Sequence, residues 1–94
     1  MSIQNFQGQD ETLTVKISGM GFEQVFFKIK AKSTFRRMME RYVQRIGVKD
    51  LRLVNFLLNG DHINPNQTPD QVGLQHGDEI EVVAMQTGGG ENER

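Results

Sequence analysis

Apolar and polar residues alternate in two stretches near the beginning of the 94-residue chain. The alternating apolar residues are Leu13, Val15 and Ile17 in the first stretch and Val25, Phe27 and Ile29 in the second. A period of two places successive side chains on opposite faces of a strand, so both stretches are predicted to be half-buried strands. Gly19 and Gly21 favour a turn between them, which predicts a β-hairpin.

The spacing of the apolar residues changes to that of a helix after Thr34. Positions at intervals of three and four are occupied by Phe35, Met38, Met39, Tyr42, Val43 and Ile46. This stripe predicts a helix over residues 34–46, capped by Ser33 or Thr34 and ended by Gly47. A methionine stripe can line a partner-binding groove, but an apolar stripe of this width more often faces the core, and we interpret it in that way.

Short elements follow the helix. Residues 53–58 (LVNFLL) have the apolar character of a buried strand, and residues 59–61 (NGD) favour a tight turn. Residues 62–63 are predicted to form a short return strand that ends before Pro65.

A helical turn and a last strand complete the pattern. Thr68 is suited to cap a single helical turn with Pro69 at its first position. Residues 78–85 alternate again, with Ile80 and Val82 on the inward face.

This order of elements predicts the fold class. A lone helix must bury its apolar stripe on one face of a sheet, and only a mixed sheet that grips the helix satisfies every segment. We therefore expect an α+β fold of the β-grasp, ubiquitin-like type, ββαββ with a mixed sheet packed on one long helix. The domain is expected to span residues 12–85, after a disordered N-terminal arm of residues 1–11.

The composition excludes several kinds of chemistry. The chain has no cysteine, so it has no disulfide, no thiolate nucleophile and no cysteine-ligated metal. His62 and His76 stand far apart in the sequence without further ligands nearby, so we expect no metal site and no cofactor. No run of 18 apolar residues occurs, and the first residues lack a signal-peptide pattern. We therefore expect a soluble intracellular protein with no membrane contact.

The formal net charge of −1 conceals a basic half and an acidic half. Nine of the eleven positive charges are Lys28, Lys30, Lys32, Arg36, Arg37, Arg41, Arg45, Lys49 and Arg52. Residues 59–83 contain five acidic residues and no lysine or arginine. A dense basic cluster can bind nucleic acid, but this cluster lacks a recognised motif and the acidic half opposes it, so we favour protein partners.

Six stretches of the chain together resemble one family. They are FFKIK (26–30), YVQRIGV (42–48), FLLNGDHI (56–63), QTPDQVGL (67–74), DEIEV (78–82) and QTGG (86–89). In their order and spacing the chain resembles SUMO, the family of small ubiquitin-like modifiers, from about residue 12 to residue 89. The QTGG segment, a few residues after an acidic strand, is the most specific of these signals.

The resemblance implies a precursor with a short C-terminal extension. In the SUMO family a SUMO-specific cysteine protease removes the residues beyond the Gly-Gly pair. Residues 86–89 would be the conjugation tail and residues 90–94 the extension. The processing site would comprise Gln86, Thr87, Gly88, Gly89 and Gly90. Glycines suit this role because a backbone without Cβ atoms can thread a narrow enzyme tunnel.

The resemblance also implies the chemistry that follows processing. The Gly89 carboxylate would be adenylated by a heterodimeric activating enzyme, passed to a conjugating enzyme, and joined with the help of ligases to lysines of target proteins. All catalytic groups would belong to those enzymes, so the chain itself is not expected to be an enzyme. We expect a monomer of the nucleus and cytoplasm.

A second implied site binds aliphatic SUMO-interacting motifs as an extended strand between the second strand and the helix. The matching positions are Phe27, Lys28, Ile29, Lys30, Ser33, Arg37, Met38, Tyr42 and Arg45. The apolar members would form the floor, and the basic members would receive acidic or phosphorylated flanks. From the residues alone, an alternative is that the lysines guard an exposed edge strand and the arginines form a solvated helix face.

A third implied surface contacts the conjugating enzyme through Asn59, Gly73 and Asp78. Asn59 replaces an acidic residue that is common in the family. The chain is also one residue longer than the family pattern between Gly47 and the FLL segment. Phe26 stands where relatives often carry a polar residue or histidine, so either a partner contact or a merely exposed aromatic fits.

Two questions remain open at the level of the sequence. The predicted arm contains no lysine, so polymeric chains would have to form through Lys16, Lys28, Lys30, Lys32 or Lys49. The alternative function is a non-conjugated ubiquitin-like interaction module in which the terminal glycines are incidental.

Overall fold

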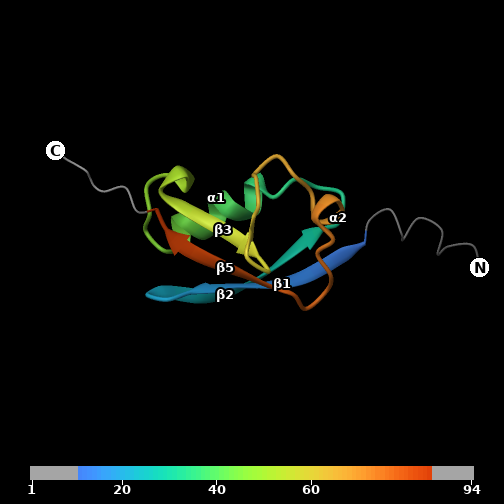
Figure 1. Ribbon diagram of the computed structural model, residues 1–94, viewed down its shortest axis with the longest axis horizontal. Helices are drawn as coiled ribbons and strands as arrows, with labels where there is room; N and C mark the ends of the chain where they lie inside the picture. The colour runs from blue at the N-terminus through green and yellow to red at the C-terminus, as the bar shows by residue number, and fades with distance from the viewer. Residues whose placement is uncertain (1–10, 86–94) are drawn as a thin grey trace, which may run out of the picture.

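The first two strands pair in the antiparallel hairpin that their alternation predicts, with Val15 opposite Phe27. They belong to a computed structural model that describes residues 11–85 (Figure 1). The elements are β1 (Thr12–Gly19), β2 (Phe22–Lys30), α1 (Arg36–Arg45), a 3-10 helix (Leu51–Leu53), β3 (Val54–Leu58), β4 (Asp61–His62), α2 (Pro69–Val72) and β5 (Glu79–Ala84). The predicted N-terminal arm lies outside the described residues except for Glu11, whose carbonyl accepts the N–H of Ala31 at 2.9 Å.

Helix α1 is shorter than its apolar stripe. Its N-cap residue is Phe35, and no side chain caps the first turn, so the predicted capping by Ser33 or Thr34 is wrong. The backbone N–H of Phe35 donates instead to the carbonyl of Gln67 at 2.9 Å. A segment 32 positions further along the chain thus satisfies a donor at this end of the helix. Gly47 follows the helix with a φ of 81°, in the left-handed conformation expected there.

The second half of the chain follows the predicted order with shifts of one residue. Strand β3 begins at Val54 because Leu51–Leu53 form a 3-10 helix, which occupies the segment that is longer than the family pattern. Strand β4 ends at His62, although the N–H of Ile63 still donates to the carbonyl of Phe56 at 2.8 Å. Thr68 caps α2 in a reciprocal capping box, as predicted.

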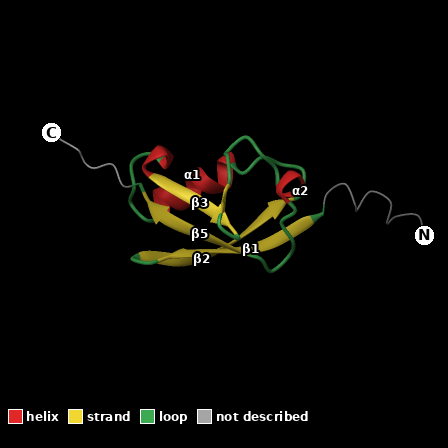
Figure 2. Cartoon of the chain, in the orientation of Figure 1, coloured by secondary structure: helices red, strands yellow, loops and turns green. Residues whose placement is uncertain are grey.

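The sheet has five strands in the order β2-β1-β5-β3-β4. Strands β1 and β5 pair in parallel at the centre, and the other pairs are antiparallel. Helix α1 lies across one face of this mixed sheet (Figure 2). The β-grasp prediction is therefore confirmed. Strand β2 is an edge strand, since only β1 pairs with it.

The core lies between α1 and the sheet. Tyr42, Phe35 and Phe56 are its largest fully buried side chains. Met38 and Met39 are buried too, at 5% and 1% exposure, so the core interpretation of the apolar stripe is confirmed. Within residues 11–85 no polar or charged side chain is buried apart from the hydroxyl of Tyr42.

Gly19 lies where β1 approaches the backbone of β5 most closely. A Cβ atom built on Gly19 would overlap the carbonyl oxygen of Val82. The register of the hairpin also shifts between Ile17 and Gly19, so the strand is irregular at this point. The close contact involves backbone on both sides and cannot be relieved by a side-chain rotation.

We predict that Gly19→Ala lowers the free energy of unfolding by about 1–3 kcal/mol or more, because the methyl group forces β1 and β5 apart. Urea denaturation measures the change. Gly21→Asn is the matched control, since Gly21 has a φ of 83° but open space around its Cα, and asparagine tolerates that conformation. Equal stability of Gly19→Ala and the wild-type chain would contradict the close approach.

Candidate functional site

A groove runs between the free edge of β2 and α1. Its volume is about 370 Å³. We call it the β2–α1 groove, and it is lined by Phe27, Lys28, Ile29, Lys30, Ser33, Thr34, Arg37, Met38 and Arg41. Seven of these nine residues are among those that the sequence assigns to a peptide site. The geometry thus brings seven of the nine predicted residues together, from a strand, a helix and the loop between them.

The floor of the β2–α1 groove is part of the core. Ile29 and Met38 are only 7% and 5% exposed, while Phe27 is half-buried and packs against the core at the surface. The alternation along β2 turns Phe27 and Ile29 toward the helix. The apolar floor is therefore held in place by the same packing that stabilises the domain.

The free edge of β2 offers backbone hydrogen bonds beside this floor. The N–H of Ala31 donates to Glu11 across the hairpin, which makes them a hydrogen-bonded pair. By the alternation of an antiparallel ladder, Ile29 and Phe27 also bond to β1, whereas the N–H and C=O groups of Phe26 and Lys28 point outward. An extended chain laid along β2 would find donors and acceptors there.

Positive charge is unevenly distributed along the β2–α1 groove. Within residues 11–85, no ion pair is formed by Lys28, Lys30, Arg37 or Arg41. At the other end, the guanidinium of Arg45 lies 3.4 Å from the carboxylate of Glu23. Arg45 lines a neighbouring hollow that shares Phe27 and Arg41 with the groove. The uncompensated charge therefore lies toward the Lys30 and Arg37 end.

Tyr42, which the sequence places in the peptide site, lies behind the groove rather than in its lining. Its side chain is fully buried, and its hydroxyl donates to the carbonyl of Glu23 at 2.6 Å. Its ring meets those of Phe27 and Phe56 edge-on, with centroids 6.4 Å and 6.1 Å apart. Burial, and to a smaller extent Glu23, raises the pKa of Tyr42. Tyr42 thus packs against the core side of the Phe27 ring and helps to hold it in place.

Two lining residues were missed at the level of the sequence. Thr34 follows Ser33 at the end of the β2–α1 groove, and Arg41 lies one helical turn after Arg37. The i, i+4 spacing of Arg37, Arg41 and Arg45 was a usable signal for a shared helix face.

The predicted conjugating-enzyme contacts lie elsewhere on the domain. Asn59 occupies the β3–β4 turn with a φ of 54°, and Asp78 directly precedes β5. Because Leu57 pairs with Glu81, this turn and the start of β5 lie at the same end of the sheet. A hollow of about 670 Å³ there is lined by Ser18, Gly19, Met20, Leu57, Asn59, Gly60, Glu79 and Glu81. Of the three predicted contacts only Asn59 lines it, since neither Asp78 nor Gly73, the left-handed cap that ends α2, is in its lining.

The described chain ends beside the first residues of β3. The N–H of Met85 donates to the carbonyl of Leu53 at 3.0 Å, and the residue is 42% exposed. Figure 1 shows β5 ending at the opposite end of the sheet from the start of β1. The predicted processing residues, Gln86, Thr87, Gly88, Gly89 and Gly90, lie outside the described residues.

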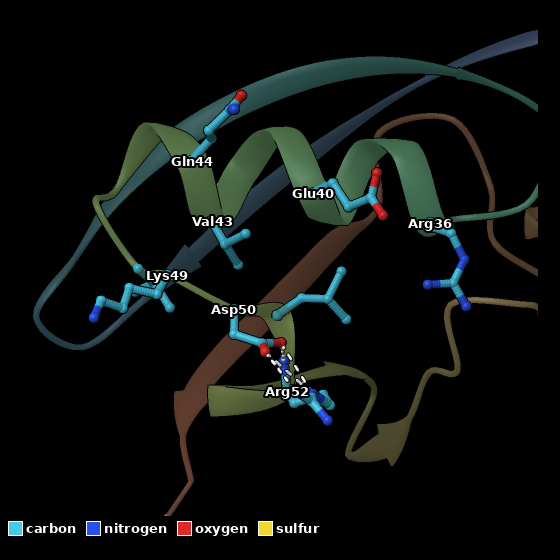
Figure 3. A pocket seen from close by; sticks show the side chains of 9 residues that line it. Arg36, Glu40, Val43, Gln44, Lys49, Asp50 and Arg52 are labelled. Carbon is cyan, nitrogen blue, oxygen red and sulfur yellow. Dashed lines mark hydrogen bonds and ion pairs between the residues drawn. The ribbon is translucent and has the colours of Figure 1, made fainter.

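A further hollow of about 460 Å³ lies between α1 and the 3-10 helix (Figure 3). Its rim carries charges of both signs on Arg36, Glu40, Lys49, Asp50 and Arg52. The carboxylate of Asp50 accepts from the guanidinium of Arg52 at 2.7 Å and from its backbone N–H at 2.9 Å. These bonds from Arg52 hold the pKa of Asp50 at about 2, below its ordinary value of 3.8. The mixed charges select no ligand class.

Both histidines make hydrogen bonds within the domain. The Nδ1 atom of His76 accepts the N–H of Thr14 at 3.1 Å, and His62 Nε2 lies 3.1 Å from the side-chain oxygen of Asn55. In the described part of the chain, no three His, Asp or Glu side chains gather as metal ligands would. None of the helices within residues 11–85 is long and apolar enough to cross a membrane.

Comparison with known sequences gives matches over nearly the whole domain. Residues 13–84 match the family described as Ubiquitin-2 like Rad60 SUMO-like. The ubiquitin-like protein pmt3/smt3 of Schizosaccharomyces pombe is 38% identical over 88 residues, which cover 94% of this chain and 74% of that protein. Small ubiquitin-related modifier 2 of Arabidopsis thaliana is 35% identical over 82 residues, which cover 87% of this chain and 79% of that protein.

Comparison with solved structures agrees on the fold. The ubiquitin of Caldiarchaeum subterraneum superposes with a TM-score of 0.71 at 14% identity, covering 84% of this chain and all of that one. A designed protein based on ubiquitin gives a TM-score of 0.70 at 21% identity, covering 85% of this chain and 96% of the design. A chain described under molecular mimicry of SUMO in DNA repair gives 0.68 at 18% identity, with coverage of 78% and 91%. At these identities the likeness shows the ubiquitin-like fold alone.

We predict that Arg52→Gln raises the pKa of Asp50 from about 2 toward 3.8, because the guanidinium that stabilises the carboxylate is removed. An NMR titration of the Asp50 carboxyl carbon measures this pKa. The folded-state pKa is the lower one, so this contribution to stability is present above pH 3.8 and is lost as the pH falls toward 2. Arg36→Gln is the control, since Arg36 donates to Asn66. An unchanged Asp50 midpoint in Arg52→Gln would refute the assignment.

Proposed function

The chain belongs to the SUMO-like family of ubiquitin-like proteins, and on this premise we propose that it is a protein modifier that is processed after Gly89 and joined through the Gly89 carboxylate to target lysines. The observation that carries the proposal is where the domain ends. Met85 is exposed at the rim of the sheet, and the next residues in sequence are QTGG. The predicted acyl donor therefore follows the folded domain after only three residues.

The chemistry of the proposed transfer requires no catalytic group from this chain. A neutral lysine amine attacks the Gly89 carbonyl carbon of a thioester, the amide bond forms, and the carbon–sulfur bond to the conjugating enzyme breaks. The proton lost by the amine leaves with the cysteine sulfur, which is released as a thiol. The partners are the family's cysteine protease, activating enzyme, conjugating enzyme and ligases, together with the target lysines. The places of action are the nucleus and cytoplasm.

A second part of the proposal concerns recognition by the β2–α1 groove. An extended aliphatic peptide would add to the edge of β2 and place its apolar side chains on Phe27 and Ile29. The half-buried Phe27 and the outward backbone groups of Lys28 support this mode. We assign the acidic flank of such a peptide to the Lys30 and Arg37 end, because Glu23 already faces Arg45 at the other end.

The contact with the conjugating enzyme is proposed for the end of the sheet that carries Asn59 and Asp78. Glu79 and Glu81 line the hollow beside Asn59, so carboxylates are present although Asn59 itself is neutral. A basic partner surface would fit this end by charge. The proposed contact also includes Gly73, which ends α2 outside the lining of that hollow.

We predict that a SUMO-type cysteine protease cleaves the chain between Gly89 and Gly90 and removes Gly90–Arg94. Intact mass spectrometry detects the loss, and the trimmed chain should then form a reductant-sensitive thioester with the activating and conjugating enzymes and ATP. Gly89→Ala is the control, because it should prevent cleavage and thioester formation without changing a residue of the folded domain. A trimmed chain that never forms a thioester would leave the non-conjugated interaction module as the function.

The charge distribution generates a prediction for peptide binding. The variant Arg37→Glu should bind an acidic-flanked aliphatic peptide about three-fold more weakly, since a lost exposed pair is worth roughly 0.7 kcal/mol. Arg45→Glu is the matched control on the same helix face and should have a smaller effect, because Glu23 compensates that charge. Isothermal titration calorimetry measures both, and an equal effect of the two would contradict the assigned orientation.

Substitution of the groove floor is a poorer test of binding. Ile29 is a core residue, so Ile29→Ala would cost about 2–5 kcal/mol of stability. The charged rim can be changed without that loss.

A further inference from the structure

The edge strand β2 presents a second row of side chains on the face away from the helix. This outer row consists of Phe26, Lys28 and Lys30, which alternate with the floor residues Phe27 and Ile29. The two lysines also line the rim of the β2–α1 groove. Phe26 is 61% exposed. Only four large apolar side chains in the described region are exposed to solvent, and Phe26 is one of them. Unlike the two lysines, Phe26 does not line the β2–α1 groove.

Phe26 has a neighbouring strand on one side only. Across the hairpin it pairs with Lys16, whose ammonium lies 3.7 Å from the carboxylate of Glu79 on β5. On its other side the sheet ends. The ring therefore borders the place that a further strand would occupy, and the backbone groups of Phe26 point to the same place.

The protective interpretation of the basic edge does not account for Phe26. Lysines on an edge strand discourage pairing with other chains, whereas an exposed aromatic on the same edge favours it. The presence of both residue types on one edge is explained if the edge binds only strands of matching side chains. Lys28 and Lys30 have no ion-pair partner within residues 11–85, so they are free to select one by charge.

We propose that the outer row is a second specificity determinant of the peptide site, and that it reads the side chains of the bound strand that face away from the groove. The partner is an extended peptide with an aromatic or aliphatic residue opposite Phe26 and acidic residues opposite Lys28 and Lys30. Its intervening aliphatic residues lie on Phe27 and Ile29. This inference rests on the proposed peptide binding at β2.

The pattern follows from the geometry of an added strand in either chain direction. Residues of neighbouring strands that face the same side lie about 4.5–5.5 Å apart at their Cβ atoms, which allows direct aromatic and charged pairs. Such pairs change binding by about two- to five-fold each. The outer row thus refines a site whose affinity depends mainly on the groove.

The test uses peptides with the central pattern X-Val-Asp-Val-Asp and its reverse, in which X is phenylalanine or serine. They are titrated by calorimetry into the full chain and into Phe26→Thr, which keeps a residue suited to strands. The phenylalanine peptide should bind the wild-type chain about two- to five-fold more tightly than the serine peptide, and Phe26→Thr should abolish that difference. Met20→Thr is the control, since Met20 is exposed in the turn before β2 and does not line the β2–α1 groove.

The outcomes separate this inference from the proposed function. If both peptides bind the wild-type chain equally, or if Phe26→Thr weakens both alike, the outer row is refuted while groove binding stands. If neither peptide binds, peptide recognition at β2 fails, and the outer row with it. If sedimentation shows a wild-type dimer that Phe26→Thr dissociates, the ring serves pairing with a second copy and the inference is overturned.

Discussion

The apolar stripe of α1 packs on one face of the sheet, and Tyr42 occupies the middle of that contact. Its ring is fully buried between Phe27 on the edge strand and Phe56 on β3. A buried tyrosine hydroxyl needs a hydrogen-bond partner, and the carbonyl of Glu23 supplies it. One side chain thus ties the helix to the edge strand β2 and to β3, two strands that are not neighbours in the sheet. The relative placement of β2 and α1, and hence the groove, depends on it.

The recognition surface is a consequence of this packing and of the strand order. The central position of β1 leaves β2 with one free edge, and the helix supplies an apolar wall next to it. The backbone of a free edge and an apolar wall are the two elements that strand addition requires. The face that stabilises the domain therefore continues directly into the surface that we assign to partners, so floor residues serve both purposes.

The charges and the chain ends are distributed over different parts of the domain. The uncompensated basic residues border the β2–α1 groove, while Glu79 and Glu81 lie at the end of the sheet near Asn59. The chain leaves the sheet at Met85, beside Leu53. Peptide recognition, enzyme contact and acyl transfer can then use separate surfaces. Opposite charge on the first two would also keep their partners apart.

The sequence by itself determined the elements whose signals are local. Apolar periods of two and of three to four located the hairpin and α1, the Thr68 capping box and Pro69 located α2, and most of the groove residues followed from their family positions. Only the tertiary structure decided what depends on contacts between distant residues. Gln67 rather than Ser33 or Thr34 satisfies the start of α1, and Tyr42 lies behind the groove instead of in it.

The same reason explains the remaining differences. The pairing of Arg45 with Glu23 and the one-sided neighbourhood of Phe26 depend on how the strands are ordered in space, and that order joins segments far apart along the chain. A periodic pattern states which face of an element is buried, because that information is repeated every few residues. It does not state which element covers that face, since non-local pairing is settled by the packing of the whole domain.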